Sequence, residues 1–174
     1  MEVVATLRFS TPCLGNIRQS DYDKMQRDPD GNIIFLPSWW KAAFIQASTA
    51  INQHRKMVDK ILPALVVEGA LTKIKRRYGS RAHEVHEHEG FDETSLVVVR
   101  FALSPGVAVE QFRELLQAVG SYVGFSPYRQ TDCGFFTVVS LETPLSRRAK
   151  GGSSARASSD KKGGKPASGN STAR

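Results

Sequence analysis

Histidines and acids alternate in residues 83–89, which read HEVHEHE. In an extended backbone His86 and His88 share one face with Glu84, and two imidazoles with a carboxylate could hold zinc or another divalent ion. The surrounding residues 78–94 are polar and predict a loop, where a metal would lack apolar walls and supporting hydrogen bonds. The alternative is that these acids balance the basic residues just before them, and we expect neither a metal nor a cofactor.

Cations cluster in residues 72–77, which read TKIKRR. If this segment is a strand, Lys73, Lys75 and Arg77 project to one side, and with Arg81 they could contact the phosphates of a nucleic acid. The alternative is a solvated edge strand whose charges prevent pairing with other sheets. Both interpretations predict an exposed basic face.

A third candidate is the segment from Gly120 to Gly134, called the glycine loop below. Its glycines, Gly124 among them, allow close approach of another backbone. Tyr128 offers a ring for stacking and Arg129 offers a cation, a combination that suits a single-stranded nucleic acid. The alternative is a connection whose glycines serve only its turns.

The elements that would position these residues follow from hydrophobic periodicity. Alternating apolar residues predict strands over residues 3–9, 64–77, 96–103 and 135–141. Helical spacing predicts a first helix from residue 38 through residues 53–56 and a second over 109–119. Ser38 is the predicted N-cap of the first helix. The tight-turn sequence DPDG at residues 28–31 predicts a hairpin over residues 24–36, inserted before that helix.

The order strand, helix, strand, strand, helix, strand predicts an α+β protein with ferredoxin-like βαββαβ topology, one antiparallel sheet with two helices on one face. The first and third strands would be central, and six of their residues would face the helices: Val3, Leu7, Phe9, Val97, Val99 and Phe101. The opposite face then carries Arg8 and Arg100 near each other, where they could contact phosphates or bases, or instead pair with Glu68 or Glu142. This face lacks the aromatic residues of an RNA-recognition motif.

Two segments of this pattern resemble the RAMP superfamily of CRISPR-associated RNA-binding proteins. The glycine loop is similar to the loop that precedes the last strand in that superfamily, although its glycines are sparse. Residues 35–44, FLPSWWKAAF, resemble the element that opens the first helix and touches guide RNA, with Lys41 at the basic position and Trp39-Trp40 in place of small residues. The resemblance implies a ferredoxin-like fold and an RNA partner. The same segments are also similar to short phage-encoded proteins.

The charge of the chain is unevenly distributed. The 174 residues carry 24 basic and 17 acidic side chains, a net charge of +7, and residues 146–174 hold eight of the cations and one acid, Asp160. Residues 1–145 are therefore neutral, and we expect them to form one domain. Residues 146–174 have no side chain suited to a core, so we expect a disordered basic tail that could add non-specific affinity for nucleic acid. Two cysteines, no membrane-spanning run and no signal peptide predict a soluble cytoplasmic protein.

The sequence therefore predicts a non-enzymatic module that binds single-stranded RNA or DNA. One alternative is an interaction protein of a phage or mobile element, or a homo-oligomer, that docks a partner through an exposed Trp39 and the hairpin. Another is an RNA-cleaving enzyme, for which His54, on the first helix, is the one histidine outside residues 83–89. The sequence has no hydrolase elbow, P-loop or H-E-x-x-H motif, and we assign no catalytic residue.

Overall fold

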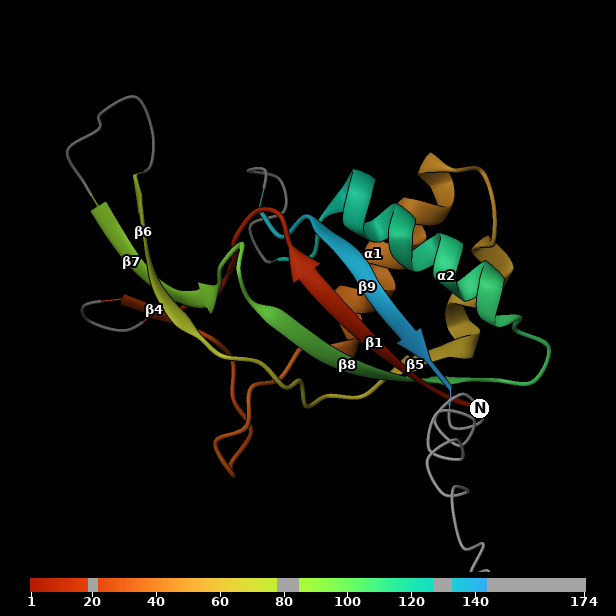
Figure 1. Cartoon of the computed structure of the whole chain (residues 1–174), viewed down its shortest axis with the longest axis horizontal. Coiled ribbons are helices and arrows are strands. Elements are labelled where there is room, and N and C mark those ends of the chain that lie inside the picture. Colours follow the sequence, from red (N-terminus) through yellow and green to blue (C-terminus); the bar gives the residue numbers. More distant parts are fainter. Residues whose placement is uncertain (19–21, 78–84, 127–132, 144–174) are drawn as a thin grey trace, which may run out of the picture.

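The protein is an α+β fold, and its computed structural model describes residues 1–18, 22–77, 85–126 and 133–143. Within these residues the main sheet has four strands in the order β5 (Ile61–Pro63), β8 (Leu96–Leu103), β1 (Glu2–Phe9) and β9 (Phe136–Glu142). The neighbouring pairs are antiparallel, and β1 and β8 lie at the centre (Figure 1). The predicted strands over residues 3–9, 96–103 and 135–141 are confirmed to within one residue.

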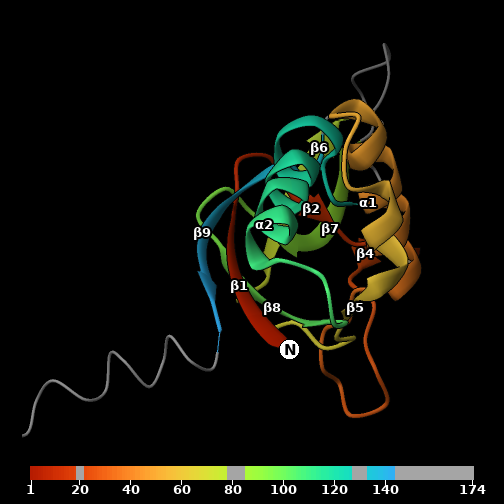
Figure 2. The same ribbon diagram turned by 90° about the vertical axis from the view of Figure 1, so that its right-hand side faces the viewer.

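Both α-helices pack on the same face of this sheet (Figure 2). After α1 (Pro37–Ala50) comes the short 3-10 helix η1 (Arg55–Lys60), and α2 (Val109–Ala118) continues into the π-helix η2 (Val119–Val123). The predicted N-cap Ser38 is wrong, because α1 begins one residue earlier at Pro37, whose fixed φ suits a first helical position. No helix in the described ranges is long and apolar enough to cross a membrane.

A second sheet, which the periodicity did not predict, flanks the first. It contains β2 (Cys13–Leu14), β3 (Ile17–Arg18), β4 (Tyr22–Lys24), β6 (Thr72–Arg77) and β7 (Val85–Phe91). β7 pairs antiparallel with β2 and β6 and parallel with β4. The β6 and β7 pair projects away from the main sheet (Figure 1), and we call it the β6–β7 arm.

Two predictions fail where the arm leaves the main sheet. Residues 64–77 do not form one strand, because the backbone stays beside β8 only as far as the bridge between Glu68 and Val98. The chain then enters β6 in the second sheet. Residues 78–94, predicted as a polar loop, contain β7. The alternation of His with Glu in this segment is itself a period of two, which is typical of a strand.

The predicted hairpin over residues 24–36 is present as a short turn. The Gly31 N–H donates to the Asp28 carbonyl at 3.0 Å, and Gly31 has a φ of 85°, a conformation that glycine adopts without strain. A bridge joins Arg27 to Ile33 across this turn. Residues 33–35 then pair with residues 65–67, so the end of the hairpin extends the outer edge of the main sheet.

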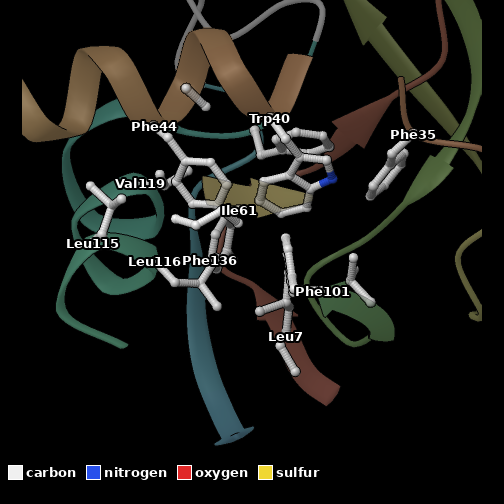
Figure 3. Packing of buried hydrophobic residues seen from close by; sticks show 14 of the residues in the cluster. Leu7, Phe35, Trp40, Phe44, Ile61, Phe101, Leu115, Leu116, Val119 and Phe136 are labelled. Carbon is white, nitrogen blue, oxygen red and sulfur yellow. The ribbon is translucent and has the colours of Figure 1, made fainter. Parts of the chain in front are cut away.

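The core lies between the main sheet and the two α-helices. Alternation along β1 and β8 turns six side chains toward the helices, and all six are buried, as predicted: Val3, Leu7, Phe9, Val97, Val99 and Phe101. Trp40 and Phe44 of α1 and Leu115 and Leu116 of α2 fill the space above them (Figure 3). Burial of each such side chain stabilises the fold by roughly 1.5–3 kcal/mol.

Candidate nucleic-acid interface

One face of the β6–β7 arm carries predicted cations. Lys73 and Lys75 lie on the same side of β6 because they are two residues apart, and both are exposed. Across the pair they face Glu89 and Glu87 of β7, and Lys75 Nζ lies 3.1 Å from Glu87 Oε1. An exposed ion pair of this kind stabilises a protein by at most about 1 kcal/mol. Lys75 can therefore exchange its carboxylate partner for a phosphate at little cost.

The opposite face of the arm docks on the glycine loop. Arg76 lies on that face and donates a hydrogen bond from Nη1 to Sγ of Cys133. Both Cys133 and Cys13 are buried free thiols, and burial raises the pKa of the Cys13 thiol well above its ordinary value. The hydrogen bond between Arg76 and Cys133 joins two segments that are far apart in the sequence, and it brings the basic strand beside the glycine loop.

The alternating histidines belong to the same arm. His86 and His88 share a face of β7, as predicted, but His86 is exposed and His88 is only 1% exposed. Nδ1 of His88 lies 3.2 Å from the Gly15 carbonyl and 3.4 Å from Oδ2 of Asp23. A carbonyl oxygen can only accept a hydrogen bond. The hydrogen is therefore on Nδ1 of His88, and this N–H donates a hydrogen bond to the Gly15 carbonyl. Within the described ranges, no three His, Cys, Asp or Glu side chains are grouped so that they could hold a metal ion.

Backbone packing explains two glycines of the glycine loop. Gly124 and Gly134 have φ angles of 74° and 79°, and a Cβ at Gly134 would overlap the Phe125 carbonyl. The Gly134 N–H donates to the Pro12 carbonyl at 2.9 Å, and the Phe125 N–H donates to the Gly134 carbonyl at 2.6 Å. The two ends of the loop are therefore fixed to each other and to the segment after β1.

The start of α1 also contacts the glycine loop. Trp40 stacks on Phe125 with ring centroids 3.9 Å apart, and Trp39 packs on the same ring at 6.3 Å. Trp39 is therefore partly buried, which corrects the expectation of an exposed docking residue. Lys41 is exposed and forms a 2.6 Å ion pair with Asp59 of η1. The first turn of α1 holds no acidic side chain that would repel a phosphate.

Arg8 and Arg100 lie on the face of the main sheet that points away from the helices, but they are not neighbours. In the pairing of β1 with β8, Arg8 faces Leu96 and Arg100 faces Val4, so four positions, or about 13 Å, separate the two arginines. Arg100 donates to Glu68 at 2.8 Å, as the alternative predicted, and this hydrogen bond raises the pKa of the Arg100 guanidinium. Arg8 forms no ion pair with any described residue.

The structure thus brings some of the predicted residues together and separates others. Lys73, Lys75 and Lys41 lie on elements that contact the glycine loop, whereas Arg8 and Arg100 lie on a different surface. The side chains of Arg77, Tyr128 and Arg129 lie outside the described part of the chain.

Arg76 and Phe125 make the contacts that join these elements, and the sequence prediction did not single them out as contacts. The sequence contained one indication for Arg76, its position in β6. Arg76 alternates with the other cations of this strand, so its side chain projects to the opposite face. Phe125 follows Gly124 and is a large apolar residue. The sequence therefore predicts only that it is buried, and not which residues it contacts.

Comparisons with known proteins bear on the fold. No protein-family model and no curated protein matches this chain. Among solved structures, it is similar to a chain in the cryo-EM structure of the Type III-B Cmr-beta bound to cognate target RNA, with a TM-score of 0.50 and 8% sequence identity. The match covers 81% of this chain and 59% of the other, so the protein spans less than two thirds of that chain.

A second similar chain belongs to a Type IV-B CRISPR complex. Its TM-score is 0.48 at 9% identity, and the match covers 94% of this chain and 96% of the other. At such low identity, the likeness of the first chain concerns the fold alone.

Proposed function

We propose that this protein binds single-stranded RNA on a surface formed by the β6–β7 arm, the glycine loop and the start of α1. The observation that carries the proposal is the docking of Arg76 on Cys133, because it brings β6 beside the glycine loop, and the other face of this strand carries the exposed Lys73 and Lys75. Tyr128 and Arg129 of that loop would add a stacking ring and a second kind of cation. The protein acts as a binding module, without catalysis.

The chemistry of this surface suits a flexible, charged strand. Lysines contact phosphates as point charges, and they fix the position of a nucleic acid without reading its bases. Lys41 would contact a phosphate near the first turn of α1, because the positive end of the helix dipole favours an anion there. Base identity would then contribute little to affinity on this surface.

The fold supports the same proposal. The order β5-β8-β1-β9, with the first and third core strands central and both α-helices on one face, agrees with a ferredoxin-like, RAMP-like core. The fold resembles that of a chain in a complex bound to target RNA, which favours RNA over DNA as the partner. Residues 1–145 would form the folded module, and residues 146–174 would add affinity that does not depend on sequence.

Fluorescence anisotropy with a labelled single-stranded RNA of mixed sequence tests the proposal. We expect the full chain to bind, and the double variant Lys73→Gln, Lys75→Gln to bind about 5- to 20-fold more weakly at low salt. The slope of log affinity against log salt should also become shallower by about 1.4, since each phosphate contact on a single strand contributes about 0.7.

The matched control removes two cations from the helical side of the molecule, with Lys60→Gln and Arg113→Gln. This control changes the net charge equally, so it should weaken binding by less than about twofold. Equal weakening by both double variants would show that only net charge matters and would overturn the assignment of this surface. Absence of binding to RNA at low salt would overturn the function, and tighter binding to DNA would change its ligand.

A second candidate function is assembly with a protein partner. Leu62, Leu65 and Val66 are 61%, 49% and 41% exposed along the outer edge of the main sheet, next to the hairpin end. Exposed apolar side chains of this kind are common in contacts between subunits. A stable oligomer in solution that Leu62→Ser and Leu65→Ser disrupt, together with no affinity for RNA, would favour this role.

A further inference from the structure

A hollow of about 550 Å³ lies at the far end of α1 from the glycine loop contact. Ile51 and Phe136 contribute apolar lining, and the amide side chains of Gln53 and Gln117 line it with Ser121. Pockets that bind small molecules usually have volumes of about 300–1,000 Å³ and combine apolar walls with a few polar groups. Among the described residues, no lysine or arginine lines this hollow, which we call hollow A, so it suits a neutral group.

The π-helix η2 supplies an aromatic ring to hollow A. Tyr122 lines the hollow yet is 69% exposed, so its ring belongs to the surface rather than to the core. A Cβ at Gly120 would overlap the Phe136 carbonyl, which shows how closely this turn packs on β9. Single π-helical turns are rare and frequently lie at functional sites. Here the turn places an exposed tyrosine at a polar hollow.

A second hollow of about 500 Å³, hollow B, follows the turn between α1 and η1. Gln53 lines both hollows, so they meet at this side chain. Arg55 and Lys56 line hollow B and are exposed, and neither forms an ion pair with a described residue. The Arg55 guanidinium donates one long hydrogen bond, 3.4 Å, to the Thr49 hydroxyl. Hollow B is therefore suited to an anion.

The turn between the hollows is strained and held in place. Asn52 and His54 have φ angles of 51° and 61°, a left-handed conformation that is strained for residues other than glycine. His54 Nε2 lies 2.7 Å from Oε2 of Glu114 on α2, which fixes the turn to the second helix. The prediction that His54 lies on the first helix is wrong, because α1 ends at Ala50 and His54 precedes η1. Strain of this kind gathers at ligand-binding positions.

We infer that the two hollows together bind one nucleotide. The planar base lies in hollow A against the Tyr122 ring, and the amides of Gln53 and Gln117 contact its edge. An amide presents a donor and an acceptor side by side, which matches the edge of a nucleobase. The phosphate lies in hollow B with Arg55 and Lys56. The Glu114 carboxylate also lines hollow A. It contacts the His54 imidazole, and its charge does not repel a neutral base.

The nucleotide could be free or could be the terminal residue of a strand. Ser121 and Tyr122 of hollow A belong to the glycine loop, but neither Lys73 nor Lys75 lines a hollow, so the two proposals rest on different side chains. Failure of either proposal therefore leaves the other standing. The variant Lys73→Gln, Lys75→Gln should bind a free nucleotide as the unaltered protein does.

The fluorescence of 2-aminopurine, which falls when the base stacks on an aromatic ring, tests the inference on the full chain. One arm uses free 2-aminopurine riboside 5′-monophosphate up to about 1 mM, and the other uses short RNAs with this base at the 5′ end, at the 3′ end or inside. We expect quenching that Tyr122→Ala weakens at least fivefold and Tyr122→Phe retains, since stacking contributes a factor of at least five per base. Quenching by the free nucleotide identifies a nucleotide site, and quenching by one RNA end alone identifies a strand-end site.

The phosphate position is tested with the same probe. Arg55→Gln with Lys56→Gln should weaken binding of the monophosphate at least fivefold and leave the uncharged riboside unchanged, whereas Lys60→Gln at the other end of η1 should change neither. Circular dichroism verifies that each variant is folded. Absence of quenching in both arms, or quenching that Tyr122→Ala leaves intact, would overturn the base position. Equal effects on monophosphate and riboside would overturn the phosphate position.

Discussion

Two histidines on β7 show how much a residue's role depends on its surroundings. His86 and His88 have the same type, the same strand and the same face, and their alternation with acids suggests a pair of metal ligands. In the structure His88 is buried between β7 and the segment after β2, where it donates to the Gly15 carbonyl, while His86 remains exposed. The shared face followed from the period of two, but burial of one ring depended on which segment packs there.

The two histidines should therefore differ in their effect on stability. Replacing His88 with Ala removes a buried ring and leaves the Gly15 carbonyl without its donor, so the free energy of unfolding should fall by more than about 2 kcal/mol. The matched variant His86→Ala should lower it by less than about 0.5 kcal/mol, as is usual at exposed positions. Urea unfolding followed by circular dichroism measures both values. Equal losses would contradict the buried role of His88.

Arg8 and Arg100 give a second lesson at the residue scale. The alternation of β1 and β8 predicted correctly that both point away from the helices. Their separation of four positions depends on the register between the strands, which places Arg8 opposite Leu96. The register is set by core packing and by the loops, and no local pattern in either strand specifies it.

At the scale of elements, the main sheet and helices follow the sequence periodicity and the second sheet does not. β1 and β8 bury one face against helices, so their apolar residues alternate clearly. The strands β2, β3 and β4 have two or three residues each, too few for a period to be recognised. β6 is mostly charged and β7 alternates His with Glu, because much of their surface remains in solvent. Tertiary pairing, and not burial of an apolar face, specifies these strands.

Substitutions at two glycines, one in the glycine loop and one outside it, should separate the cost of a left-handed backbone from the cost of steric overlap. Gly106 and Gly134 both have positive φ, at 86° and 79°, but a Cβ would meet open space at Gly106 and the Phe125 backbone at Gly134. Gly106→Ala should therefore cost about 1–2 kcal/mol of stability, from the left-handed conformation alone. Gly134→Ala should cost at least about 2 kcal/mol more, because the loop must shift.

Chemical denaturation of the two glycine variants measures this difference. If Gly134→Ala also weakens binding of RNA in the folded protein, whereas Gly106→Ala does not, the glycine loop contributes to the proposed surface. Equal destabilisation by both substitutions would show that the overlap at Gly134 relaxes without cost.

At the scale of the whole molecule, charge and fold are separate properties. The net charge of +7 equals the charge of residues 146–174, and the remaining 145 residues are neutral. A neutral body with a basic segment would bind nucleic acid in two ways. The folded residues would make local contacts, and the basic segment would attract the phosphates of any nucleic acid, whatever its sequence. The pI of the chain therefore carries no information about the surface of the β6–β7 arm.

Deleting residues 146–174 should separate these two contributions. If all eight cations contact phosphates of a single strand, they contribute about −5 to −6 to the slope of log affinity against log salt. The shortened protein should lose most of that salt dependence and keep the affinity that Lys73 and Lys75 provide. Anisotropy titrations at four salt concentrations measure the slope. An unchanged slope would contradict a role of this segment in binding.

The sequence by itself determined the α+β class, the main strands and helices, and the helix-facing residues, because burial of one face imposes a period that can be counted. It also located the basic cluster of β6 and the glycine loop as separate candidates. Only the tertiary structure decided that these two segments touch through Arg76 and Cys133, that His88 is buried, and that the turn after α1 lies between two hollows. These relations join residues that are distant in the chain, so they depend on packing and register rather than on any local pattern.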